Sequence, residues 1–222
     1  MPGMYVHCRH LWGIACDARD RAISEAAANP ESWTSDTTVS IVLAAAVAEA
    51  FINELPEMVA MERDVSGRAP ESLSSALHAF ANAHAEVERS RGSVTLKYLI
   101  AAQTLSGTMF DKGANPFQDF VLLLSLRNDL MHLKPRDEFT EAQDGTPTVK
   151  WPKYVASLQQ RGLARVPDGN VIMSWFNTVQ TPAMAMWACE TAKEIILSVL
   201  KLIPDDPIPG KDPSSMFKKM FR

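Results

Sequence analysis

Apolar residues recur along most of the chain at the spacing of helices, and the alternation typical of strands is scarce. The most apolar helix is expected from about Asp36 to Leu55, where alanine, leucine and isoleucine cover every side and Ser35 or Asp36 can cap the N-terminus. A helix that is apolar all round is normally central to a fold. Pro56 is expected to end or kink this helix, with a further turn through Glu62.

Four more helices are predicted farther along the chain. They run from Pro70 to Arg89, from Thr95 to Met109, from Asn115 and Pro116 to Lys134, and from Thr181 and Pro182 to Leu202. Pro135 stops the third of these, because a proline disfavours helical geometry at the residue before it. In residues 136–180 we expect a short helix at 151–163 and a small hairpin at 164–175, around Asp168 and Gly169.

This pattern predicts an all-α fold, an up-and-down helical bundle of about five main helices with a long connection before the last helix. We expect residues 1–35 to form an N-terminal arm, residues 36–203 to form the helical domain with an insert at 136–180, and residues 204–222 to form a flexible C-terminal tail. A length of 222 residues, of which 46% are hydrophobic and 22% charged, suits one globular domain of this kind.

Charge, apolar stretches and cysteine content limit the kinds of binding partner and the cellular location to be expected. The net charge of -4 gives no global positive field to attract nucleic acid, so any such binding must depend on a local site. The longest apolar stretch, Ile41 to Ile52, contains Glu49 and is shorter than the roughly 20 residues of a membrane span. The N-terminus lacks the pattern of a secretory signal, and three cysteines cannot all pair within one chain. We therefore expect a cytoplasmic protein that does not contact a membrane.

A cluster of polar residues interrupts the apolar helix that ends before Pro135. The stretch SLRNDLMHLKP places Arg127 among four apolar helical neighbours. An arginine enclosed there keeps its charge, so it requires an anion from another helix, a second subunit or a ligand. His132 lies in the last turn, where the helix dipole favours the protonated imidazole, with Asn128 and Asp129 one turn before it. The four neighbours are Leu123, Leu124, Leu130 and Met131.

Arg127 and His132 do not share one helix face. Five residues separate their side chains by about 140° around a regular helix. They converge only if the last turn is distorted, if the arginine bends round, or if a second copy of the helix completes the pair.

The hexamer RNDLMH, Arg127 to His132, resembles the motif of the HEPN superfamily (higher eukaryotes and prokaryotes nucleotide-binding), in which an arginine is followed by a polar residue, a short spacer and a histidine. The resemblance covers the helical core from about Asp36 to Leu202, with its specific evidence in the hexamer and in AEAFINEL. It implies a metal-independent endoribonuclease of toxin or phage-defence type that works as a homodimer, without a cofactor. The implied catalytic residues are Arg127 and His132, supported by Asn128.

Three further residues enter as supporting candidates. Glu49 and Asn53 resemble a polar pair of the family's first helix, and Asp129 lies within the hexamer, where a solvated role suits it as well. The implied partners are an RNA substrate, a second copy of the chain, and a cognate antitoxin or regulator.

The chemistry suits these residue types. RNA is cut without a metal when its 2'-hydroxyl is deprotonated and attacks the adjacent phosphorus, which requires a proton acceptor, a proton donor for the leaving 5'-oxygen, and positive charge on the phosphorane. Histidine and arginine can supply all three. The products are a 2',3'-cyclic phosphate and a 5'-hydroxyl, and chelators have no effect.

Several residues also have a structural interpretation. Arg127 can form a salt bridge with Glu49 while His132 caps helix carbonyls, and the family includes members that bind a nucleotide, an RNA or a partner without cutting. The N-terminal His and Cys residues fit no standard zinc spacing, so no metal site is expected. The tryptophans and methionines near the last helix are expected in the core or at a dimer surface. These residues are His7, Cys8, His10 and Cys16 in the first group and Trp175, Met184, Met186 and Trp187 in the second.

Overall fold

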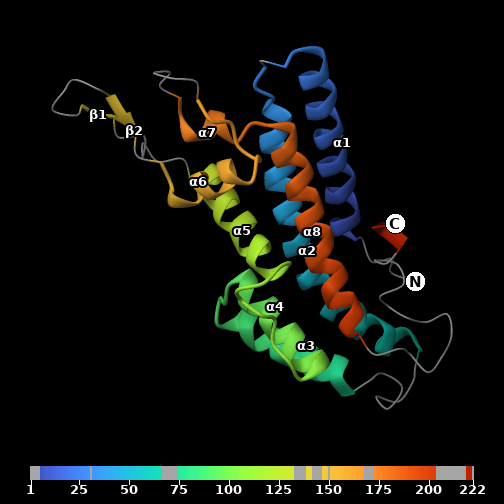
Figure 1. Cartoon of the computed structure of the whole chain (residues 1–222). Coiled ribbons are helices and arrows are strands. Elements are labelled where there is room, and N and C mark those ends of the chain that lie inside the picture. The colour runs from blue at the N-terminus through green and yellow to red at the C-terminus, as the bar shows by residue number, and fades with distance from the viewer. Residues whose placement is uncertain are drawn as a thin grey trace. The chain divides into compact units, whose positions relative to one another are not determined.

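The computed structural model is all-α, as predicted, with one short hairpin. It describes residues 6–30, 32–66, 75–132, 139–141, 147–149, 151–167, 173–203 and 219–221. The helices are α1 (His7–Ala28), α2 (Ser35–Ser66), α3 (Ser75–Arg89), α4 (Val94–Ser106), α5 (Phe117–Met131), α6 (Lys153–Gln160), α7 (Trp175–Thr178) and α8 (Pro182–Leu202), and the strands are β1 (Phe139–Glu141) and β2 (Pro147–Val149) (Figure 1).

The chain divides into two compact units that share several helices. Unit 1 comprises Met1–Leu11, Ala46–Val121 and Ala192–Arg222, and unit 2 comprises Trp12–Ala45 and Leu122–Thr191. Each unit therefore draws on segments that are far apart in the sequence.

Unit 1 is built around the second half of α2 and the helices α3 and α4. Phe51, Tyr98 and Phe120 are fully buried, and the rings of Tyr98 and Phe120 lie 4.5 Å apart between centroids. The Tyr98 hydroxyl donates a hydrogen bond of 2.8 Å to the carbonyl oxygen of Ala48, so its polar atom is satisfied inside the core. Helix α4 begins at the Ser93 cap, whose hydroxyl accepts from the N–H of Leu96, and ends at Gly107 in the left-handed conformation (φ 76°).

In unit 2, small residues allow close contact among α1, α2 and α8. Ala15, Ala18 and Ala22 of α1 have no exposed surface. The Thr37 hydroxyl of α2 donates to the carbonyl of Thr181, and the Ser40 hydroxyl donates to the carbonyl of Ala185. Figure 1 shows the parts of α1, α2 and α8 that belong to unit 2 side by side.

Helix α1 differs from the expected N-terminal arm. Residues 7–28 form a continuous helix, and a stripe of alanines and Cys8 buries one side of it. Alanine gives a weak hydrophobic signal, and the charged residues on the other faces, as in DARDR, mask the helical period. For this reason the sequence pattern did not reveal α1.

The first predicted helix continues beyond its expected end. Helix α2 runs to Ser66 with Pro56 inside it, whereas the sequence favoured an end or kink at the proline. Its segment Ser35–Met58 is long and apolar enough to cross a membrane by length and composition, and 56% of that window is buried inside the protein. The core helix of a soluble protein passes the same test, so the absence of a membrane span stays a prediction.

The insert at 136–180 contains the predicted short helix, as α6, but its hairpin lies elsewhere. Strands β1 and β2 pair antiparallel, with Phe139 opposite Val149, whereas residues 168–172 of the predicted hairpin lie outside the described residues. Trp175, expected at the end of that hairpin, begins α7 instead. Of the predicted C-terminal tail, residues 204–218 and 222 also lie outside the described part of the chain, and Phe221 is buried.

Candidate functional site at the end of helix α5

The RNDLMH hexamer lies at the solvent-facing end of α5. Leu123, Leu126 and Leu130 form the buried stripe of this part of the helix. The polar residues lie off that stripe: Arg127 and Asp129 are half-buried, and Asn128 and His132 are exposed. The helical period therefore presents the motif at the surface while its leucines hold the helix in unit 2.

Arg127 is not enclosed by apolar side chains, as its sequence neighbours had suggested. Leu123 and Leu130 are buried, but Met131 is 59% exposed, and a long arginine side chain can extend past its neighbours toward water. The Arg127 Nη1 donates a hydrogen bond of 3.0 Å to the Asn128 Oδ1. Burial alone therefore does not demand an anion at Arg127.

His132 follows the last turn of α5 without a distortion of the backbone. Its N–H donates to the carbonyl oxygen of Asn128 at 3.0 Å, which continues the helical hydrogen-bond pattern. Its side chain is exposed, and no described residue forms a hydrogen bond or ion pair with the imidazole. A regular backbone keeps the separation of about 140° between Arg127 and His132, so one copy of α5 directs them to different sides.

Asp129 has a partner that the sequence did not indicate. The Tyr154 hydroxyl of α6 donates a hydrogen bond of 2.8 Å to the Asp129 Oδ2. The Tyr154 ring also contacts Trp175 of α7 edge to face, with 6.5 Å between centroids, and Trp175 is buried. The insert is thus attached to the motif through Asp129.

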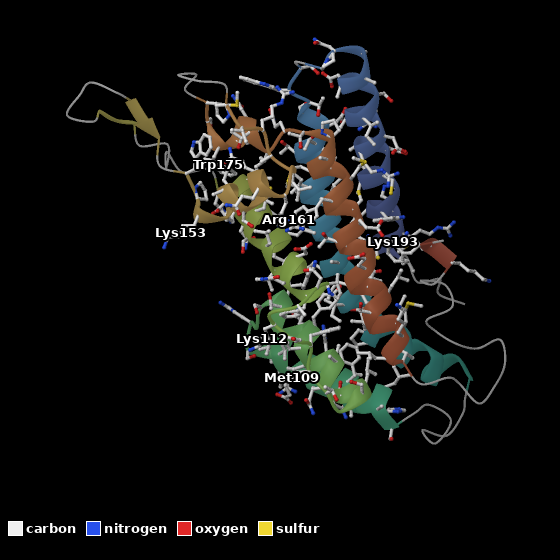
Figure 2. The ribbon with its side chains drawn as sticks, viewed as in Figure 1. Met109, Lys112, Lys153, Arg161, Trp175 and Lys193 are labelled. Carbon is white, nitrogen blue, oxygen red and sulfur yellow. The ribbon has the colours of Figure 1, made fainter. Side chains whose placement is uncertain are left out.

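Helix α6 is anchored at both ends within unit 2. Its own Val155 and Leu158 are fully buried, and the Arg161 guanidinium, just after its last residue, lies 5.6 Å from the ring centroid of Trp187 on α8. Figure 2 shows Lys153, Arg161 and Trp175 around this part of the insert. Lys153 is exposed and directly precedes Tyr154. Its positive charge therefore lies in the same helical turn as the tyrosine that contacts Asp129.

Glu49 and Asn53 belong to unit 1, whereas the hexamer belongs to unit 2. Glu49 is half-buried. The Asn53 Oδ1 accepts a hydrogen bond of 2.8 Å from the Lys97 Nζ of α4, which gives Asn53 a structural task between α2 and α4. The supporting role of this pair, and the alternative salt bridge between Arg127 and Glu49, both stay predictions.

Lys97 is a buried lysine at the centre of a polar cluster that the sequence did not indicate. The lysine is 5% exposed and forms an ion pair with Glu88 of α3 in addition to its bond with Asn53. The hydrogen bond that Lys97 donates to the Glu88 carboxylate lowers the pKa of Glu88, and burial, together with the positive charge of Lys97, lowers the pKa of His84. The signal available was a single lysine within the apolar stretch TLKYLIAAQ, the same kind of interruption that singled out Arg127.

The N-terminal histidines and cysteines do not come together. Cys8 is buried, while His7 and His10 are exposed on the surface of α1. Across the described part of the chain, no group of three or more His, Cys, Asp or Glu residues is placed to hold a metal ion. Trp175 and Met184 are buried in the core, as expected, and Met186 is 48% exposed.

No family model, curated protein or solved structure matches this chain. The residues themselves are therefore the evidence on which a function can be proposed.

Proposed function

We propose that the chain is a metal-independent endoribonuclease of HEPN type that cuts RNA at the exposed end of α5. The observation that carries this proposal is the arrangement of Arg127, held by Asn128, five residues before an exposed His132 at the end of the same helix. A guanidinium offers five N–H donors in a planar fork that suits phosphate oxygens, and Asn128 orients that fork. An exposed imidazole can give or take a proton near neutral pH.

In this mechanism Arg127 holds the scissile phosphate and stabilises the extra negative charge of the phosphorane. A histidine takes the proton of the 2'-hydroxyl, whose oxygen attacks the phosphorus. A protonated histidine then gives a proton to the leaving 5'-oxygen. The bond from phosphorus to the 5'-oxygen breaks, and a 2',3'-cyclic phosphate and a 5'-hydroxyl remain.

A second copy of the chain completes this site. One helix separates Arg127 and His132 by about 140°, whereas two facing helices can bring the arginine of one copy near the histidine of the other. Two histidines also allow one to act as base while the other acts as acid. Met131 lies between the motif residues and is 59% exposed, as an apolar contact residue of such a homodimer must be.

The test is RNA cleavage in the presence of EDTA. Purified wild-type protein should cut total RNA, and His132→Ala should lose at least about 100-fold of that activity, the usual effect of removing a general acid or base. His10→Ala is the matched control, because His10 is also exposed but lies on α1 in unit 1. Equal cutting by wild type and His132→Ala would reject the catalytic assignment.

The angular separation of Arg127 and His132 also favours a second candidate function, binding without cleavage. A single copy of α5 offers the Arg127 fork to a phosphate without a histidine on the same side. In that case RNA or a nucleotide stays intact, and Arg127→Ala weakens its binding while His132→Ala does not. Arg89→Ala is the control for charge, since Arg89 is exposed on α3 and paired only with Glu86 among the described residues.

A further inference from the structure

Cys16 of α1 and Cys189 of α8 lie together inside unit 2. Both cysteines are free, and each thiol influences the pKa of the other. The Cys189 Sγ lies 3.8 Å from the carbonyl oxygen of Ala15, the residue directly before Cys16. The Cys189 sulfur is therefore held against the backbone of α1 next to Cys16, a residue 173 positions earlier in the sequence.

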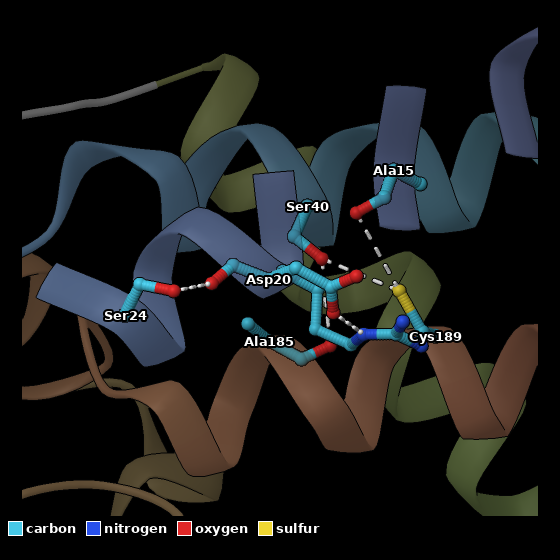
Figure 3. A network of polar contacts seen from close by, with 7 residues as sticks. Ala15, Asp20, Ser24, Ser40, Ala185 and Cys189 are labelled. Atoms are coloured by element: carbon cyan, nitrogen blue, oxygen red, sulfur yellow. Dashed lines mark hydrogen bonds and ion pairs between the residues drawn. The ribbon is translucent and has the colours of Figure 1, made fainter. Parts of the chain in front are cut away.

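The surroundings fix the position of Cys189. The Ser40 hydroxyl of α2 lies 3.4 Å from the Cys189 Sγ and also donates to the carbonyl of Ala185 on α8 (Figure 3). Cys189 is 1% exposed, so this sulfur has little freedom to move away. Cys16 is half-buried, and a small reagent can reach it from solvent.

Exposure to solvent distinguishes the two thiols. Burial raises the pKa of Cys16, the Arg19 guanidinium offsets part of that rise, and the carboxylates of Asp20 and Asp17 add to it. Burial raises the pKa of Cys189 to about 11. Cys16 is therefore the more accessible thiol, and Cys189 is the partner placed to resolve its oxidised form.

We propose that Cys16 and Cys189 are an oxidation site that a hydroperoxide converts into a disulfide joining α1 to α8. The Cys16 thiolate attacks one oxygen of hydrogen peroxide, the O–O bond breaks, and Cys16 becomes a sulfenic acid as water leaves. The Cys189 sulfur then attacks the Cys16 sulfur, the S–O bond breaks, and a second water leaves. Overall, two thiols and one hydrogen peroxide give one disulfide and two waters.

Cys8 provides an internal control. It is fully buried in unit 1, and burial together with the negative charge of Glu54 raises its pKa. Neither the geometry nor the chemistry of Cys8 suits reaction with peroxide. One alkylatable thiol should therefore remain in the oxidised protein once it is denatured.

The experiment uses the reduced full chain, treated with hydrogen peroxide, then denatured, alkylated, digested with trypsin and analysed by mass spectrometry. The expected product is one cross-linked pair of peptides, His10–Arg19 joined to Val166–Lys193, which disappears on reduction. Cys8→Ser keeps this product, whereas Cys16→Ser and Cys189→Ser lose it. The melting temperature of oxidised wild type should rise above that of the reduced form, because the link closes a long loop.

Two results would overturn the proposal. In one, Cys16 gains two or three oxygens while Cys189 remains fully alkylatable. In the other, all three thiols of peroxide-treated wild type remain alkylatable. Both results are read directly from wild-type protein, so they do not depend on the folding of a cysteine variant.

Discussion

Asp129 connects the RNDLMH hexamer to the insert through a single side chain. Its hydrogen bond from Tyr154 ties α6 to the same turn of α5 that carries Arg127 and His132. Both residues are half-buried, so water screens the interaction only in part. The position of the exposed end of α5 therefore depends on a residue from the long connection.

A double-mutant cycle measures that connection. Tyr154→Phe and Asp129→Ala should each lower the free energy of unfolding by about 1 kcal/mol, the size of one partly solvated hydrogen bond. Because both variants remove the same bond, the double variant should cost less than the sum of the two. Ser157→Ala, at an exposed position of α6, is the control. Strict additivity in urea denaturation would show that the bond contributes nothing to stability.

At the residue scale, the sequence located the hexamer but not its environment. Helical spacing correctly placed Asn128 and His132 at the end of a helix, and the structure brings Arg127 and Asn128 into contact. The prediction that apolar neighbours enclose Arg127 was wrong. Spacing along one helix does not tell which of those neighbours are covered by another element. The hydrogen bond between Tyr154 and Asp129 could not be predicted for the same reason, since nothing in the sequence pairs these two residues.

Among the helices, α1 is capped at its N-terminus by a side chain from α2. The Glu54 carboxylate accepts hydrogen bonds from the N–H groups of His7, at 2.8 Å, and Cys8, at 3.2 Å. These are N–H groups that the first turn of a helix leaves without partners. Burial raises the pKa of Glu54, and the two backbone bonds offset part of that effect.

Loss of this cap should release the first turn of α1. Glu54→Ala should lower the free energy of unfolding by about 2 kcal/mol, a magnitude typical of hydrogen bonds to a buried charge. Hydrogen exchange at the His7 and Cys8 amides should become faster. Glu57→Ala, exposed one turn later on α2, should change neither quantity. Unchanged exchange at His7 and Cys8 in Glu54→Ala would contradict the capping role.

The contact of α3 with α4 predicts a dependence of stability on pH. His84 is 5% exposed, contacts the Phe80 ring, and faces Lys97 and Glu88. Its folded-state pKa is lowered, so below its usual value of 6.5 the unfolded chain binds a proton that the folded chain does not. The contribution of neutral His84 to the free energy of unfolding is therefore complete above pH 6.5. It is lost as the pH falls toward the lowered pKa of His84.

Urea denaturation of wild type and His84→Gln at pH 7.5 and pH 5.5 separates this effect from others. The wild type should lose more stability than the variant between the two pH values. The raised pKa of Glu54 changes stability with pH in the opposite direction, but it is the same in both proteins and cancels in their comparison. The lowered pKa of Glu88 affects stability only near and below its usual value of 4.5, outside this pH range. An equal pH dependence of both proteins would exclude His84 as its source.

The success of sequence prediction differed between elements for physical reasons. The helices α2, α3, α4, α5 and α8 have leucine, isoleucine and phenylalanine at helical spacing, and each was predicted with altered ends. Helix α1 buries mainly alanines and depends on Glu54 of α2, so its local pattern is weak. The hairpin β1–β2 is only three residues long on each side, too short for a periodic signal.

For the molecule as a whole, the proposed function requires a second copy of the chain. Sedimentation velocity should find a dimer, and Met131→Lys should shift it toward monomer and reduce RNA cleavage, because a charge at a buried contact is costly. Val166→Lys is the matched control, since Val166 is 69% exposed in unit 2 but lies outside the hexamer. A wild type that cuts RNA as a monomer would contradict the composite site.

The composition of the whole chain makes a prediction about salt. Under the proposed function, a net charge of -4 leaves RNA binding to a few local cations such as Arg127, so affinity should fall only moderately as salt rises. The most direct measurement is end-group analysis of a labelled single-stranded RNA incubated in EDTA with wild type, His132→Ala and His10→Ala. We predict 2',3'-cyclic phosphate and 5'-hydroxyl ends from wild type and His10→Ala, and intact RNA from His132→Ala. Cleavage by His132→Ala at the wild-type rate, or 3'-hydroxyl and 5'-phosphate ends from wild type, would contradict the assignment.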